Sequence, residues 1–145
     1  MKQFKSKREV FEYIKKKYST AETILIKGSA VNKNLKEFSD IDVEFYQDKS
    51  AKPEYEFVLV EDKIVLITAY PYKSGKQINK IPDNILVLKG NYCEQIENQE
   101  EYSAKEREIR NNQLFLDFLF KYLRTKDKKY LETIEKYARL AWKNK

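Results

Sequence analysis

The segment from residue 23 to residue 46 constrains the fold more than any other part of this 145-residue chain. An apolar run, Thr23–Lys27, is followed by the pair Gly28-Ser29, and a second run, Asp40–Tyr46, alternates between acidic and apolar residues up to its last position. Runs of β-branched and apolar residues predict strands, and alternation predicts a strand with one buried face. We therefore expect two strands of one sheet, connected through a glycine turn.

The second of these strands is predicted to separate carboxylates from the core. Because side chains alternate between the two faces of a strand, Asp40, Asp42 and Glu44 share one face. The residues that face the opposite way, towards a core, are Ile41, Val43 and Phe45. Neighbouring carboxylates repel one another, and a hard divalent cation such as Mg²⁺ relieves this repulsion. The pattern indicates a metal site at Asp40 and Asp42, with a solvated strand face as the alternative.

The pair Gly28-Ser29 is a candidate phosphate-binding turn. Glycine lets the backbone bend and lets a ligand approach closely, and serine adds a hydroxyl and an N–H donor. Residues 30–37 are expected to form a short helix whose N-terminus faces the turn, where free N–H groups favour an anion. A Gly-Ser pair alone is usually only a turn, so this interpretation depends on the aspartates that follow.

This segment resembles the signature of the nucleotidyltransferase superfamily related to DNA polymerase β. That signature is an apolar strand, Gly-Ser, a short helix, and then Ser-Asp-apolar-Asp-apolar. The segment is most similar to the minimal nucleotidyltransferases, including the antitoxin partners of helical HEPN toxins, and to the kanamycin and lincosamide nucleotidyltransferases. The resemblance covers residues 24–45, and its spacing is matched without a gap. Lys33 stands where the loop commonly has glycine, and Ala30 and Asn32 stand where arginines often flank it.

The resemblance implies a Mg²⁺-dependent nucleotidyltransferase. Such an enzyme moves a nucleoside monophosphate, here with AMP favoured, from a nucleoside triphosphate to a hydroxyl and releases pyrophosphate. Asp40 and Asp42 would bind one or two Mg²⁺ ions, and Gly28, Ser29 and Ser39 would bind the phosphates. The acceptor hydroxyl would belong to a protein, an RNA end or a small molecule. Positioning and charge neutralisation are the main tasks of a protein in this chemistry.

The family normally has a third carboxylate on a later strand, where it is a metal ligand and often a base. The predicted strand of residues 64–70 contains no acid, and Thr68 is its only small polar residue. Glu44, on the same face as Asp40 and Asp42, is the predicted substitute, with a solvated strand glutamate as the alternative. With only two acids the protein would be a catalytically weak or inactive binding module of the same fold, such as an antitoxin or a nucleotide sensor.

The remaining chain predicts an α+β protein: a mixed β-sheet of the nucleotidyltransferase fold, with helices packed on the sheet and a C-terminal helical hairpin. A single domain is expected over residues 1–145, with a core of about 1–92 and a helical extension of about 93–145. The elements expected besides those above are a helix over 6–18, strands over 55–60, 64–70 and 84–89, a loop over 71–82, and helices from about 103 to 125 and from 130.

The C-terminal hairpin has two interpretations. The favoured one is packing across the sheet of its own domain, because each helix needs an apolar partner. The other is a homodimer or a helical partner protein, since the first helix is apolar nearly all round.

Composition narrows the classes of protein. The net charge of +6 attracts polyanions, but glutamates interspersed among the lysines indicate a solvated surface rather than a nucleic-acid stripe. A basic nucleic-acid-binding protein with structural aspartates is therefore the weakest of three interpretations. A lone Cys93 argues against a disulfide framework, and no apolar stretch is long enough for a signal core or a membrane span. We expect a cytoplasmic protein without membrane association.

Overall fold

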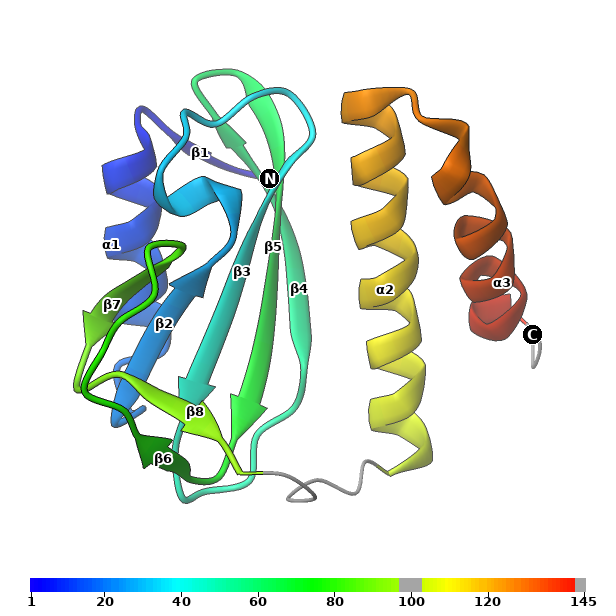
Figure 1. The fold of residues 1–145 in the computed structure, drawn as a ribbon. Coiled ribbons are helices and arrows are strands. Elements are labelled where there is room, and N and C mark those ends of the chain that lie inside the picture. The colour runs from blue at the N-terminus through cyan, green and yellow to red at the C-terminus, as the bar shows by residue number, and fades with distance from the viewer. Residues whose placement is uncertain (97–102, 143–145) are drawn as a thin grey trace.

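A mixed six-stranded sheet forms the centre of the structure, a computed structural model that describes residues 1–96 and 103–142 (Figure 1). The strand order is β1-β4-β5-β3-β2-β7, in which β1 pairs with β4 and β3 with β5 in parallel, and the other pairs are antiparallel. The strands of this sheet are β1 (Lys2–Phe4), β2 (Thr23–Lys27), β3 (Ser39–Tyr46), β4 (Glu54–Val60), β5 (Lys63–Tyr72) and β7 (Ile85–Lys89). A separate small sheet pairs β6 (Gly75–Gln77) with β8 (Cys93–Gln95).

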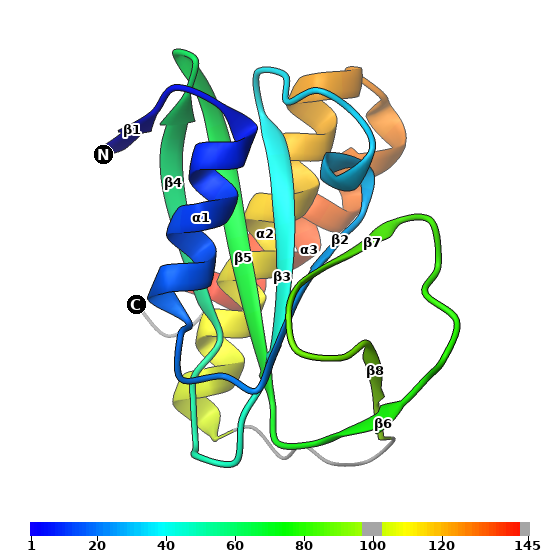
Figure 2. The same ribbon diagram turned by 90° about the vertical axis from the view of Figure 1, so that its left-hand side faces the viewer.

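Helices cover both faces of the large sheet. Helix α1 (Lys7–Lys17) lies on one face, and α2 (Ala104–Thr125) lies on the other, with α3 (Leu131–Trp142) packed on its outer side (Figure 1). Figure 2, turned by 90° from Figure 1, shows α1 in front of the sheet and α2 and α3 behind it. Short 3₁₀ turns, η1 (Ser29–Val31) and η2 (Lys128–Tyr130), complete the elements.

The C-terminal helices confirm the favoured interpretation of the hairpin. Helix α2 contacts β3, β4 and β5 of the same chain, and α3 contacts α2. Binding of a second copy or of a helical partner through these helices remains a prediction. The predicted extension of about 93–145 includes residues 97–102 and 143–145, which lie outside the described part of the chain. Among the described residues, no helix has both the length and the apolar character needed to cross a membrane.

The core between α1 and the sheet follows directly from sequence patterns. Ser6 caps α1, and its hydroxyl accepts a hydrogen bond of 3.1 Å from the N–H of Glu9. Val10 and Ile14 are fully buried on the inner side of the helix. The predicted apolar face of β3 meets them, since its residues are all buried: Ile41, Val43 and Phe45. This face of the sheet is therefore a continuous apolar layer.

The turn between β4 and β5 is a tight hairpin. Glu61 and Asp62 adopt φ angles of 51° and 66°, and Val60 pairs with Lys63. Two consecutive residues with positive φ form the tight turn that suits a two-residue hairpin.

Two local predictions were wrong. Residues 30–37 form no regular helix beyond η1. Nζ of Lys7 donates to the carbonyls of Ala30 (3.0 Å) and Lys33 (3.1 Å), so a side chain from α1 bonds carbonyls that a helix would use. Asn32 donates from Nδ2 to the carbonyl of Asp83 (2.7 Å), and side chains of this type compete with helical hydrogen bonds. The expected loop over 71–82 begins with the end of β5 and contains β6.

Candidate metal centre

Strand β3 presents its aspartates to the face of the sheet that α2 covers. Asp40 and Asp42 alternate with buried apolar residues, so both point away from the α1 core. Asp42 lies directly opposite Thr68 in the parallel pairing of β3 with β5. Thr68 is fully buried and donates a hydrogen bond of 2.9 Å from Oγ1 to Oδ1 of Asp42. The strand expected to supply a third acid thus contributes a hydroxyl, which orients one of the first two acids.

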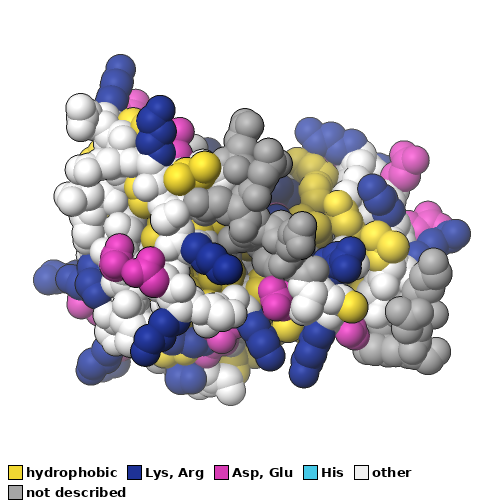
Figure 3. Space-filling view, turned by 90° about the horizontal axis from the view of Figure 1, so that it is seen from below, with side chains coloured by type: hydrophobic (Ala, Val, Ile, Leu, Met, Phe, Trp, Pro, Cys, Tyr) yellow, Lys and Arg dark blue, Asp and Glu magenta, His cyan; other side chains and the backbone are white. Residues whose placement is uncertain are grey.

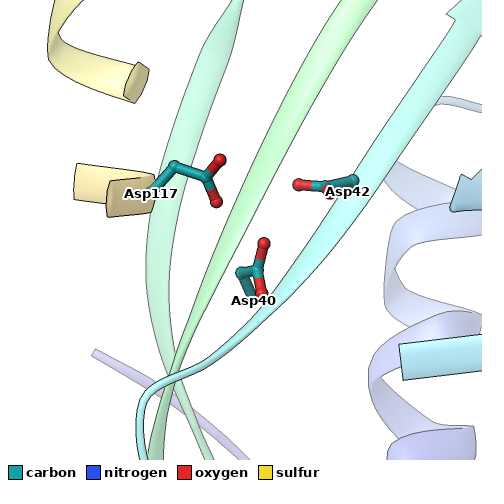
Figure 4. Close-up of side chains that lie close together, drawn as sticks. All are labelled: Asp40, Asp42 and Asp117. Carbon is teal, nitrogen blue, oxygen red and sulfur yellow. The ribbon is translucent and has the colours of Figure 1, made fainter. Parts of the chain in front are cut away.

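Helix α2 supplies a third carboxylate, Asp117. Gln113 is fully buried and fastens α2 to the sheet, since its Nε2 donates to the carbonyls of Glu54 (2.6 Å) and Ala69 (3.1 Å). Asp117 lies one helical turn further along and therefore faces the same way. Figure 4 shows its carboxylate pointing towards Asp40 and Asp42, and one ligand oxygen from each of the three lies within 4.8 Å of the others. We call these three residues the aspartate cluster.

The sequence contained a signal for Asp117 that pattern reasoning passed over. The helix around it is apolar, and Asp117 is the only charged residue in the run from Leu114 to Phe120. A carboxylate is rarely buried unless it has a partner or binds a metal. A single acid within an apolar helical run therefore indicates a buried carboxylate with a polar partner or a metal. It does not identify the strand that the helix will cover.

Burial sets the electrostatics of the cluster. Desolvation, followed by the charge of Asp40, raises the pKa of Asp42 to about 7, while the Thr68 hydrogen bond acts in the opposite direction. Desolvation also raises the pKa of Asp117 to about 8, with further contributions from a hydrogen bond with Asp40 and from the charges of both strand aspartates. Oδ1 of Asp117 is buried and has no hydrogen-bond partner among the described residues. Asp42 and Asp117 therefore keep their protons to a higher pH than an ordinary aspartate does.

Two cations of α2 border the cluster. Arg124 lies 3.0 Å from Asp40 (Nη1 to Oδ1) and donates from the same nitrogen to the carbonyl of Phe38 (2.6 Å). Lys121 lies 3.7 Å from Asp117 (Nζ to Oδ2). Phe38 adopts φ 66°, a strained angle for a bulky residue, so Arg124 also helps to fix the turn from which β3 begins.

The structure does not bring two of the predicted site residues into the cluster. Glu44 shares the face of Asp40 and Asp42, but its Oε2 forms an ion pair of 3.0 Å with Nζ of Lys27. Ser39 lies on the other face of β3 by alternation, and its Oγ accepts a hydrogen bond of 2.8 Å from the N–H of Lys36. Glu44 is therefore a neighbour of the cluster, and Ser39 closes a local turn.

The Gly28-Ser29 turn borders the cluster on the side of β2. Gly28 has φ 93°, and a Cβ built there would lie 3.6 Å from Oδ2 of Asp42. Its N–H is used internally, since it donates to the carbonyl of Asn84 (3.0 Å). Ser29 follows as an exposed residue at the start of η1. Gly28 therefore places no side-chain atom beside Asp42.

The donor set of the cluster suits a hard divalent cation. Its ligands are carboxylate oxygens only, which Mg²⁺ and Mn²⁺ prefer, whereas nitrogen and sulfur donors would favour zinc. A cation would also give Oδ1 of Asp117 the partner that it lacks. The three residues thus fit a metal on the chemistry of the ligands and on an unpaired buried oxygen.

The charged side chains on the surface indicate a ligand less clearly than the aspartate cluster does. On the face shown in Figure 3, lysines and arginines are interspersed with acidic and neutral side chains rather than gathered in a stripe. No family model matches the chain, and no curated protein matches it either.

Proposed function

We propose that this protein is a Mg²⁺-dependent nucleotidyltransferase that transfers a nucleoside monophosphate, with AMP favoured, from a nucleoside triphosphate to a hydroxyl and releases pyrophosphate. The observation that carries the proposal is the aspartate cluster, in which Asp117 completes the acidic pair Asp40 and Asp42. We also propose that its sheet is a version of the fold found in the superfamily related to DNA polymerase β. The order of β2, the Gly-Ser turn and β3 supports this similarity.

Asp40, Asp42 and Asp117 are the residues that would hold Mg²⁺. When bound there, the cation supplies charge neutralisation for the phosphates and lowers the pKa of the acceptor hydroxyl. Carboxylates from two separate layers, the sheet and α2, converge on one point, so the packing of α2 fixes the geometry of the site before any ligand arrives. Such preorganisation is the main contribution of a protein to phosphoryl transfer.

The residues of the chain have separate roles in the transfer. The acceptor oxygen forms a bond to the α-phosphorus, and the bond between that phosphorus and the bridging oxygen breaks, so that pyrophosphate leaves. With Oδ1 of Asp117 on the cation, its second carboxylate oxygen would accept the proton of the acceptor hydroxyl. Gly28 admits the phosphates beside Asp42, and the exposed hydroxyl of Ser29 donates to them.

The source of the third acid distinguishes this site from the pattern that the sequence resembles. In the family the third carboxylate comes from a later strand, and the matching position here is Thr68 of β5. Asp117 instead comes from helix α2, and its carboxylate points towards Asp40 and Asp42 on β3 (Figure 4). The lack of a third acid was the reason to favour a non-catalytic binding module. Because Asp117 fills that role in the proposal, we favour catalysis over an antitoxin or sensor that only binds.

The test combines metal binding, nucleotide binding and turnover. Wild-type protein is titrated with Mn²⁺, then with each nucleoside triphosphate and Mg²⁺, and pyrophosphate release is measured with hydroxyl acceptors from the three classes. We expect metal-dependent binding and slow pyrophosphate release that Asp42→Asn and Asp117→Asn both abolish. Glu37→Gln is the matched control, because Glu37 is an exposed acid of the preceding loop and lies outside the cluster.

The outcomes separate the candidate functions. Metal-dependent nucleotide binding without turnover for any acceptor would favour the binding module. Turnover that survives Asp117→Asn but not Asp42→Asn would remove Asp117 from the mechanism. Absence of both metal and nucleotide binding would contradict the proposal as a whole.

A further inference from the structure

Next to the aspartate cluster, Lys27 of β2 forms an ion pair with Glu44 of β3. Nζ of Lys27 lies 3.0 Å from Oε2 of Glu44, and the other carboxylate oxygen accepts a hydrogen bond of 3.3 Å from the hydroxyl of Tyr46. We propose that Lys27 binds the phosphate chain of the nucleotide and that Glu44 is the positioning residue that aims it. This inference rests on the proposed function and names a side chain that recognises the polyphosphate.

The strand register places Lys27 beside the cluster. Lys27 lies directly opposite Asp42 in the antiparallel pairing of β2 with β3. Side chains that face each other in this way share one side of the sheet, with Cβ atoms about 5 Å apart. Lys27 also immediately precedes Gly28, the residue that borders Asp42. A ligand held at the cluster would thus meet Lys27 on its β2 side.

Stability alone gives little reason for two charges at this position. The side chain of Lys27 is 33% exposed and that of Glu44 only 15%, so both groups lose much of their hydration. A buried ion pair is often no more stabilising than an apolar pair of similar volume, because desolvation offsets the attraction. Leu25, Ile85 and Val87 form apolar contacts alongside, and an apolar pair would extend that layer.

Lys27 differs from the two cations that α2 contributes. Lys121 and Arg124 are paired with Asp117 and Asp40, which the proposed cation would need as ligands. Lys27 is paired with a carboxylate outside the cluster, so a bound cation leaves its partner and its orientation unchanged. Protein kinases use the same combination, in which a lysine held by a glutamate contacts the phosphates of the nucleotide. A compact ammonium suits this role as a point charge.

The experiment measures binding of phosphate chains of different length. Wild type, Lys27→Met and Glu44→Gln are titrated by calorimetry with Mn²⁺ alone. Each is then titrated, in the presence of Mg²⁺, with three nucleotides: AMP, ADP and the α,β-methylene analogue of ATP. The analogue prevents turnover. Lys89→Met is the matched control, because Lys89 pairs in register with Ile24 on the α1 face and donates to the carbonyl of Ser19 (2.6 Å). Thermal unfolding of each variant records any loss of folded protein.

We expect Lys27→Met to weaken binding of the triphosphate analogue by about tenfold or more, as loss of a charge-assisted hydrogen bond does. The loss should be smaller for ADP and smallest for AMP, and Mn²⁺ alone should bind as tightly as to wild type. Glu44→Gln should show the same order with a smaller loss. Lys89→Met should bind every ligand as wild type does.

Equal affinity of Lys27→Met and Lys89→Met for the triphosphate analogue would overturn the inference while leaving the proposed function in place. A loss that is the same for AMP, ADP and the analogue would also overturn it, since a structural ion pair has no preference for phosphate number. A wild type that binds Mn²⁺ but no nucleotide would instead contradict the proposed function, and the inference with it.

Discussion

The two faces of the sheet are made by the same strands but have opposite chemistry. On the side of α1, β3 contributes the buried apolar side chains of Ile41, Val43 and Phe45, which pack with Val10 and Ile14 of the helix. On the side of α2, the same strand contributes Asp40 and Asp42, and Asp117 of the helix lies close to both. The first face gains free energy from burial, whereas the second forces like charges together in a poorly hydrated place. The comparison separates the residues that fold the protein from those that are placed to bind a ligand.

The largest effect is expected on nucleotidyl transfer, when an aspartate of the charged face is replaced. Asp42→Asn should lower nucleotidyl transfer by about a thousandfold, because it removes several kcal/mol of charge stabilisation from the transition state. The same substitution should raise the free energy of unfolding of the metal-free protein at pH 8 by about 1–3 kcal/mol, since it removes a buried charge while the amide oxygen still accepts from Thr68. Pyrophosphate release and urea unfolding in EDTA measure the two changes. A variant that loses both activity and stability would contradict the division between the faces.

The apolar face should respond in the opposite direction. Ile14 is fully buried, and Ile14→Ala should lower the free energy of unfolding by about 2–5 kcal/mol through lost burial and a cavity. Where the protein remains folded, its affinity for Mn²⁺ should be unchanged, because Ile14 lies on the other side of the sheet from the cluster. Urea unfolding and Mn²⁺ titration at 10 °C give the two readings. Ile81→Ala, at an exposed position, is the matched control for stability.

The pH dependence of stability distinguishes the faces without any mutation in the core. The folded-state pKa values of Asp42 and Asp117, about 7 and about 8, lie above the ordinary value of 3.8 for an aspartate, so the folded protein binds more protons than the unfolded chain between about pH 4 and pH 8. The free energy of unfolding in EDTA should therefore fall as pH rises through this window, by about 1–3 kcal/mol relative to the double variant Asp42→Asn/Asp117→Asn. Saturating Mg²⁺ should reduce the fall, since it takes the place of the protons.

Unfolding curves measured at pH 5, 6, 7 and 8 provide this comparison. Parallel pH profiles for wild type and the double variant would show that burial of the carboxylates costs the protein nothing. That result would remove the electrostatic contrast between the two faces.

Local patterns predicted most of the sheet, because its strands carry their own signals. The alternation of β3 and the β-branched run of β2 specify both strands and their buried faces without reference to the rest of the chain. Strand β1 gave no such signal, since Lys2–Phe4 is short and depends on parallel pairing with β4. The loop after Gly28 was misjudged for a related reason, because Lys7, from a distant helix, holds it.

The candidate site divides along the same line. Asp40 and Asp42 were predicted because they are two residues apart on one strand, where alternation fixes their relation. Asp117 depends on where α2 crosses the sheet, and that register is fixed by the fully buried Gln113 and its bonds to two strand carbonyls. Alternation correctly placed Glu44 on the face of Asp40 and Asp42, but its carboxylate forms an ion pair with the nearby Lys27. Periodicity predicts a face of an element and leaves undecided which partner each side chain meets.

The smallest expected effect tests whether Thr68 belongs to the charged face or only fills space. Its Oγ1 donates to Oδ1 of Asp42, and this hydrogen bond lowers the pKa of that carboxylate. Thr68→Val keeps the shape and removes the donor, so Asp42 should hold its proton to higher pH and Mn²⁺ affinity at pH 7 should fall by about tenfold, as for other residues that orient a metal ligand. Thr68→Ser keeps the hydroxyl and should restore most of the affinity. At pH 9 Asp42 should be ionised in both proteins, so the Mn²⁺ affinity of the valine variant should approach that of wild type. A loss of affinity that is the same at pH 7 and pH 9 would show that Thr68 acts through packing alone.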